Sequence, residues 1–146
     1  MTSPITSARA PRAALIAMNP WVVTLVVLLH AVVTVLHGNA HTSLGVELSF
    51  WQRTYVLIVI VAAPFVAGVL AWTRWVRIAL FVLLLSMAGS LIFGACYHYL
   101  IVSPDNVAHL PAGEARGMFR STAMLLFVTE ALGVIVAVLG LRASRT

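Results

Sequence analysis

Long apolar stretches dominate this chain and decide what it can fold into. The first runs from Trp21 to Leu36, and His30 is its only ionisable residue. Three more stretches follow, over about 54–72, 76–101 and 118–141. A helix needs about 20 mainly apolar residues to cross a bilayer. Only 9% of the residues are charged, against about 25% in a soluble domain. The sequence therefore predicts an all-α integral membrane protein, an antiparallel bundle of four transmembrane helices whose partner is the lipid bilayer.

Proline and glycine indicate where these helices begin, bend and end. Asn19-Pro20 is a typical helix start, and Gly38-Asn39 is a typical end, so we expect the first span over 20–37. Pro64 falls near the middle of the second span and predicts a kink there. The domain organisation that follows has three parts: a flexible basic cytoplasmic tail over 1–19, one membrane domain over 20–142 and a cytoplasmic tail over 143–146.

Arginines give the orientation. The chain has nine Lys and Arg residues in total, and all of them are arginine. Six lie in the two tails and in the connection between the second and third spans, and three lie in the other loops: Arg53, Arg116 and Arg120. The positive-inside rule then places both termini in the cytoplasm. The arginines form no basic patch, which argues against a nucleic-acid partner.

A chain rich in Ala, Val and Arg but without lysine suggests a GC-rich bacterial genome, and hence a multi-pass protein of the bacterial inner, or plasma, membrane.

The first apolar stretch also has features of a cleaved signal peptide. Gly38-Asn39-Ala40 satisfies the small-x-small cleavage rule, and cleavage there would remove residues 1–40. However, the apolar stretch exceeds the usual length of about 7–15 residues, and it contains His30. We therefore interpret it as a retained helix.

The histidines are the strongest functional feature. His30, His37 and His41 are separated by seven and then four residues, which places them on nearly the same face of a helix. The predicted topology puts His98 at the outer end of the third span and His109 in the outer loop that follows. No histidine falls on the cytoplasmic side.

This distribution predicts a transition-metal site at the extracytoplasmic face. His37 and His41 have the spacing of two ligands on adjacent helical turns. If His41 lies beyond the helix end, a tight loop could still return it. His98 could add a third nitrogen from a neighbouring helix. His109 or Asp105 could complete the set. Nitrogen and oxygen ligands suit zinc, copper or iron. The chain would then be a metalloenzyme or oxidoreductase, or a metal-handling protein. The simpler alternative is that these histidines bond only to lipid headgroups and loop backbone.

Glu130 is the only acidic residue inside a predicted span. A carboxylate near the middle of a bilayer must be protonated or paired, and His30 lies at a similar predicted depth. Such a pair could relay protons, support the metal ligands from outside or bind a polar substrate. The simpler alternative is a single hydrogen bond from a neutral Glu130 to a neighbouring helix.

Other function classes remain open from the sequence. Histidines on facing helices could hold haem b in an electron carrier. Glu130 and His30 could serve a small proton-coupled transporter, which would need to form a homo-oligomer to enclose a pathway. The chain could also be an accessory subunit of a larger membrane complex without chemistry of its own. The single cysteine, Cys96, excludes an intramolecular disulfide and any CxxC motif.

Overall fold

The computed structural model describes residues 19–144. Residues 1–18 of the predicted N-terminal tail and residues 145–146 lie outside the described part. The chain order is α2 (Pro20–Leu44), α3 (Phe50–Tyr55), η1 (Val56–Ala62), α4 (Ala63–Leu70), α5 (Val76–Ala95), η2 (Cys96–Leu100) and α6 (Arg116–Ala143). Here η marks π-helical segments. No β-strand occurs between residues 19 and 144.

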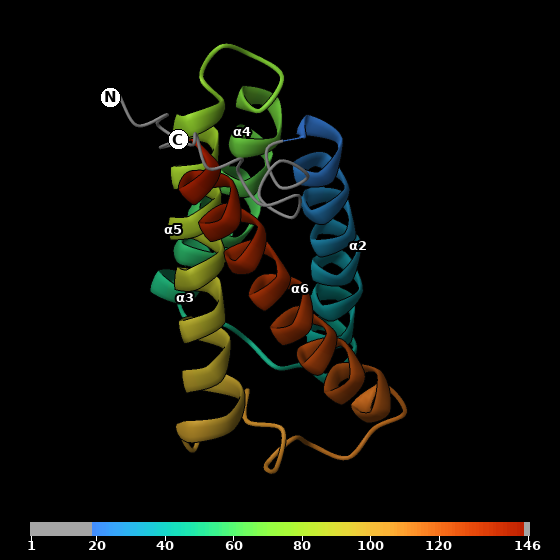
Figure 1. Cartoon of the computed structure of the whole chain (residues 1–146). Helices are drawn as coiled ribbons and strands as arrows, with labels where there is room; N and C mark the ends of the chain where they lie inside the picture. The colour runs from blue at the N-terminus through green and yellow to red at the C-terminus, as the bar shows by residue number, and fades with distance from the viewer. Residues whose placement is uncertain (1–18, 145–146) are drawn as a thin grey trace, which may run out of the picture.

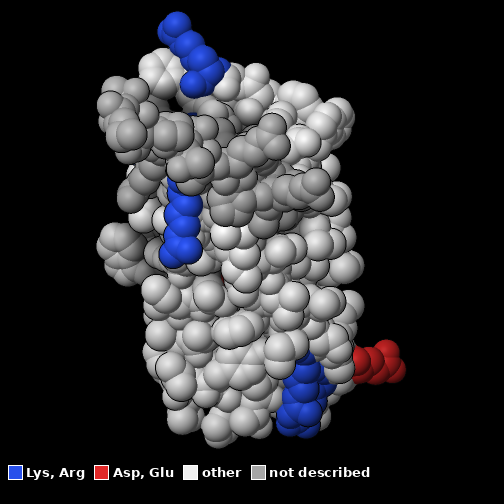
Figure 2. All heavy atoms as spheres, viewed as in Figure 1, with Lys and Arg blue, Asp and Glu red and all other residues white. Residues whose placement is uncertain are grey.

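Four helical stretches are long and apolar enough to span a membrane. They cover Pro20–Leu44, Phe50–Leu70, Val76–Leu100 and Arg116–Ala143, with mean hydropathies of 2.1 to 2.4. The predicted all-helical chain with four candidate spans is therefore confirmed. Figure 2 shows one face of the molecule, where charged side chains are few and most of the surface between the two ends is uncharged.

The four stretches form an antiparallel bundle with two distinct ends (Figure 1). The start of α2, the end of α6 and the connection over 71–75 lie at one end. The loops over 45–49 and 101–115 lie at the other, which we call the histidine end. The helix α6 packs against α5 and α2, whereas α4 packs mainly against α5. The core between them is apolar, and its fully buried members include Leu80, Leu83 and Met87.

The helix α2 continues well past its expected end. It runs through Gly38-Asn39 to Leu44, and Gly45 takes the left-handed conformation (φ 64°) that ends it. The hydroxyl of Thr42 donates to the Gly38 carbonyl at 3.1 Å, as expected for a helix that continues. The expectation of a helix end at residue 37 was wrong, because Gly45 and not Gly38 provides the C-cap. As a result, His41 lies in the same helix as His37, one turn further on.

The second span begins earlier than expected and changes helix type. Ser49 forms a capping box with Gln52 and starts α3 at residue 50. A π-helical segment, η1, then precedes Pro64. Proline has no N–H to donate to the carbonyl four residues earlier, which belongs to Ile60. His30 Nε2 lies 3.1 Å from that carbonyl oxygen, and both side chains are buried. His30 thus supports the backbone next to the proline.

Candidate metal centre

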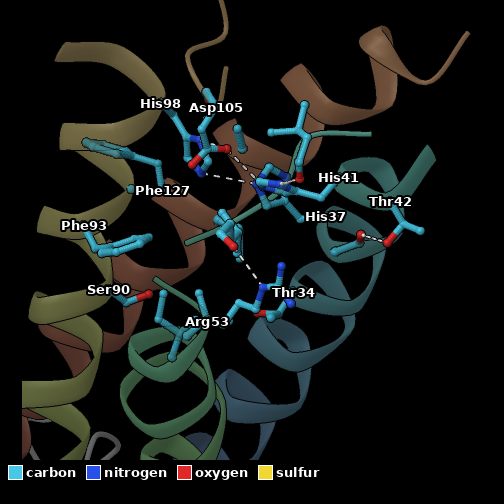
Figure 3. Close-up of a pocket in the computed structure, with 18 of the residues that line it drawn as sticks. Thr34, His37, His41, Thr42, Arg53, Ser90, Phe93, His98, Asp105 and Phe127 are labelled. Atoms are coloured by element: carbon cyan, nitrogen blue, oxygen red, sulfur yellow. Dashed lines mark hydrogen bonds and ion pairs between the residues drawn. The ribbon is translucent and has the colours of Figure 1, made fainter. Parts of the chain in front are cut away.

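Three histidine side chains meet at the histidine end. His37 and His41 come from α2, and His98 comes from η2. Each offers one nitrogen, and these three nitrogens all lie within 4.8 Å of one another. His37 and His98 are buried, and His41 is partly buried. Figure 3 shows the two side chains of α2 facing His98 across the interior.

A threonine fixes the protonation pattern of His37. Thr122 Oγ1 lies 2.9 Å from His37 Nδ1, and the same hydroxyl donates to the carbonyl of Met118 at 2.7 Å. Because its single proton is used there, Thr122 accepts a hydrogen bond from the Nδ1–H of His37. The lone pair of a neutral His37 is then on Nε2.

A backbone carbonyl fixes which ring nitrogen of His98 carries the proton. His98 Nδ1 lies 3.0 Å from the carbonyl oxygen of Asp105, which can only accept. The Nδ1 of His98 therefore carries the proton, and its Nε2 carries the lone pair. The two Nε2 atoms of His37 and His98 lie 3.2 Å apart. Two lone pairs at this distance repel each other unless a proton or a metal ion lies between them.

The distance fits a shared metal ion. Neighbouring nitrogens of a tetrahedral zinc site, with Zn–N bonds of about 2.05 Å, lie roughly 3.3 Å apart. The donor set is also suitable, since imidazole nitrogens bind zinc, copper and iron. Donation from Nδ1–H to an oxygen is the usual arrangement behind metal-bound imidazoles.

Asp105 lies beside two of the three rings. One of its carboxylate oxygens, Oδ1, is 3.1 Å from His41 Nε2 and 3.3 Å from His98 Nδ1. Burial would raise the pKa of Asp105, but the two imidazoles outweigh burial and hold that pKa well below its usual range. Asp105 is therefore an anion in a buried setting. It does not belong to the group of three nitrogens, and beside His98 Nδ1 it has the place of an outer partner of a ligand. The other nitrogen of His41, Nδ1, lies 3.3 Å from the carbonyl oxygen of Val46, so a metal ion bound by His41 would replace one of its two oxygen contacts.

A phenylalanine forms the apolar side of the site. Phe119 of α6 is fully buried. Its ring centroid lies 4.6 Å from that of His37, 4.7 Å from that of His41 and 5.6 Å from that of His98. One aromatic ring thus contacts all three imidazoles, restricts their rotation and keeps water from that side.

The three histidines line a cavity of about 430 Å³. Its deeper wall includes Glu130 and Ser90, which are both buried, and Ser90 Oγ donates a hydrogen bond to Glu130 Oε1. Gly94 lies close to both Glu130 and His98. A Cβ at Gly94 would lie 3.7 Å from His98 Cδ2 and 3.9 Å from Glu130 Oε2. A buried carboxyl group and a buried imidazole thus border the same space.

The remaining candidate residues do not join the group of three nitrogens. His109 is exposed, and its Nδ1 lies 3.3 Å from the side-chain oxygen of Asn106. His30 is bonded to Ile60, and Glu130 is bonded to Ser90. The expected direct pair of Glu130 and His30 does not form among the described residues, because each has a closer partner on another helix.

Several residues of the site could not be recognised in the sequence. Phe119 and Thr122 are ordinary apolar or small polar residues of a membrane span. Ser90 lies four and eight residues before Gly94 and His98 on one helix face, but nothing in the sequence marks it as the partner of Glu130. The signal available for Phe119 and Thr122 is weak: they lie three residues apart on α6, on one helix face.

We compared the chain with family models, with curated proteins and with solved structures, and none of them matches it. The geometry of the site is therefore the basis for assigning a function.

Proposed function

We propose that this chain is an integral membrane protein that binds one transition-metal ion through His37, His41 and His98, and that it is a metal-dependent enzyme. One observation carries the proposal. The Nε2 atoms of His37 and His98 face each other at 3.2 Å, while both Nδ1 atoms already have oxygen partners. This arrangement leaves two lone pairs for one cation.

The number of ligands favours catalysis over a structural role. Structural zinc sites are closed by four protein ligands, whereas catalytic sites have three and keep one position open. Here three nitrogens converge at the wall of a cavity. A bound ion would supply a Lewis acid there, or a redox centre if it were copper or iron.

Glu130 is our candidate for proton transfer in the cavity. It is the buried carboxyl group on the same wall as His98. Ser90 holds one of its oxygens, while Oε2 lies near Gly94. We assign Glu130 to accept or return a proton at a ligand in the cavity, and Ser90 to position it.

We propose that the histidine end faces away from the cytoplasm in a bacterial inner membrane. The arginine distribution in the sequence supports this orientation.

The geometry favours one small ion over haem b. Axial haem ligands lie on opposite sides of the iron, about 4 Å apart for metal–nitrogen bonds of about 2 Å. The Nε2 atoms of His37 and His98 are 3.2 Å apart, and their rings are 80° from coplanar, which is typical of neighbouring ligands. No comparable observation favours a transporter or an accessory subunit.

Elemental analysis of the purified protein tests the proposal. We expect about one zinc, copper or iron per chain after incubation with the metal and removal of the excess. His37→Ala and His98→Ala should each remove the bound metal. The matched control is His109→Ala, because His109 is an exposed histidine at the same end of the bundle. Glu130→Gln should also keep its metal.

Two outcomes would overturn the proposal. One is protein that stays free of metal after incubation with zinc, copper and iron. The other is a full metal content in His37→Ala and His98→Ala. Circular dichroism of each variant separates loss of the site from loss of the fold.

A further inference from the structure

The cavity has a mouth and a floor with different chemistry. Residues at the mouth are exposed, and they belong to α2, the loop over 45–49 and α3: Gly38, Thr42, Gly45, Glu47 and Arg53. The floor is formed by buried residues that include His37, His98 and Glu130. Between mouth and floor the wall is largely apolar, with Val56, Ile60, Phe93 and Leu126.

Arg53 is the one cationic side chain on this lining. The capping box of Ser49 places Arg53 in the short helix α3. Its Nε donates to the carbonyl of Leu48 at 2.9 Å, which holds the guanidinium group beside the cavity (Figure 3). This hydrogen bond to the backbone fixes the side chain but does not neutralise its positive charge.

Among the residues that the structure describes, none provides a counterion for the charge of Arg53. Within residues 19–144, neither of its Nη groups has a hydrogen-bond or ion-pair partner. Glu47 also lines the mouth, yet it forms no ion pair with Arg53. A guanidinium group presents paired N–H donors that fit the two oxygens of a carboxylate or a phosphate.

We infer that the cavity binds an amphiphile with an oxyanion head, which Arg53 holds at the mouth while the apolar body extends toward the histidines and Glu130. This deepens the proposed function, on which it rests, by naming the substrate class. The volume of about 430 Å³ would hold roughly 14 non-hydrogen atoms, at about 30 Å³ for each water-sized group. A single chain of about ten carbons with a carboxylate or phosphate head has this size.

Calorimetric titration of the protein in a non-ionic detergent tests the inference. The ligands are decanoate, decyl phosphate and decanol, which share a chain and differ in the head. Decanoate or decyl phosphate should bind, and the tighter of the two identifies the head. Decanol should bind at least about tenfold more weakly, because it lacks the charge.

Arg53→Gln should weaken binding of the anion by at least about tenfold. The matched control is Arg120→Gln. Arg120 is also exposed and also donates from Nε to a backbone carbonyl, that of Val107, at 3.0 Å, but it does not line the cavity. It should leave binding unchanged.

A second variant narrows the mouth without changing charge. A Cβ at Gly38 would meet no atom within 4 Å, so the backbone there leaves room for a side chain to begin. The ring of Gly38→Phe should hinder entry of the chain, and circular dichroism checks that the variant folds. Equal binding of decanol and decanoate, or unchanged anion binding in Arg53→Gln, would overturn the inference, and weaker binding in Gly38→Phe would support entry of the chain past Gly38.

The same titration separates this inference from the metal proposal. It is run on chelator-treated protein and on zinc-loaded protein. Binding that depends on Arg53 in the chelator-treated protein supports the anion site even if no metal ever binds. Metal binding with no effect of Arg53→Gln would leave the metal proposal intact and refute the anion site.

Discussion

His37 and His98 point their Nε2 atoms at each other across 3.2 Å, although they are 61 residues apart in the chain. Each ring donates its Nδ1 proton to an oxygen on the far side. The hydroxyl of Thr122 and the carbonyl of Asp105 therefore decide which nitrogen faces inward. The metal site depends on these two acceptors as much as on the histidines.

Thr122→Val should weaken metal binding without removing the ligands. The change keeps the shape of the side chain but deletes the oxygen that accepts from His37 Nδ1–H. The ring can then rotate or change its protonated nitrogen. Loss of such a partner typically costs about 10- to 100-fold in metal affinity, which competition against a chelator measures.

Thr129→Val is the control for this change. Thr129 is another buried threonine of α6, and its hydroxyl donates to the Leu126 carbonyl at 3.0 Å. It does not line the cavity. Equal metal affinities of the two variants would show that Thr122 has no part in the site.

Asp105→Asn should also reduce metal affinity, by about 10- to 100-fold. The substitution keeps the backbone carbonyl that accepts from His98 but removes the negative charge beside His41 and His98. A buried anion near the ligands favours a bound cation, so its loss weakens binding. The same chelator competition serves as the measurement.

Glu114→Gln removes an exposed acid from the same loop and should leave the affinity unchanged. If both variants lose affinity equally, the effect comes from the net charge of the loop and not from Asp105.

The sequence predicted the helical architecture and the meeting of the histidines. Residues 37 and 41 share a helix face through the helical period, and His98 ends an adjacent antiparallel span. The end of α2 could not be predicted, because the chain offers two glycines and only tertiary structure selects Gly45 as the cap. The partner of His30 could not be predicted either. It is a backbone carbonyl next to Pro64, which no side-chain pattern reveals.

His30→Leu should destabilise the protein and leave metal binding unchanged. His30 and Ile60 are both buried, and the bond from Nε2 to the Ile60 carbonyl is 3.1 Å long. Loss of a buried donor costs about 1–3 kcal/mol in the free energy of unfolding. Unfolding in a detergent–denaturant titration gives this value, and elemental analysis gives the metal content.

His30→Gln provides the internal control, since its amide N–H can still donate to that carbonyl. It should recover part of the lost stability. Loss of metal in His30→Leu protein that remains folded would instead place His30 within the functional site.

Gly133→Ala should destabilise the bundle through the contact between α5 and α6. A Cβ at position 133 would lie 2.6 Å from Cγ and 3.0 Å from Sδ of Met87, and Met87 is fully buried in the core. Overpacking of this kind lowers the free energy of unfolding by about 1–3 kcal/mol.

Gly117→Ala is the matched control in α6, where a Cβ would meet no atom within 4 Å. Alanine's higher helix propensity makes this change neutral or stabilising. Thermal unfolding of both variants in detergent is the measurement. Equal midpoints would mean that α5 and α6 are further apart than the structure places them.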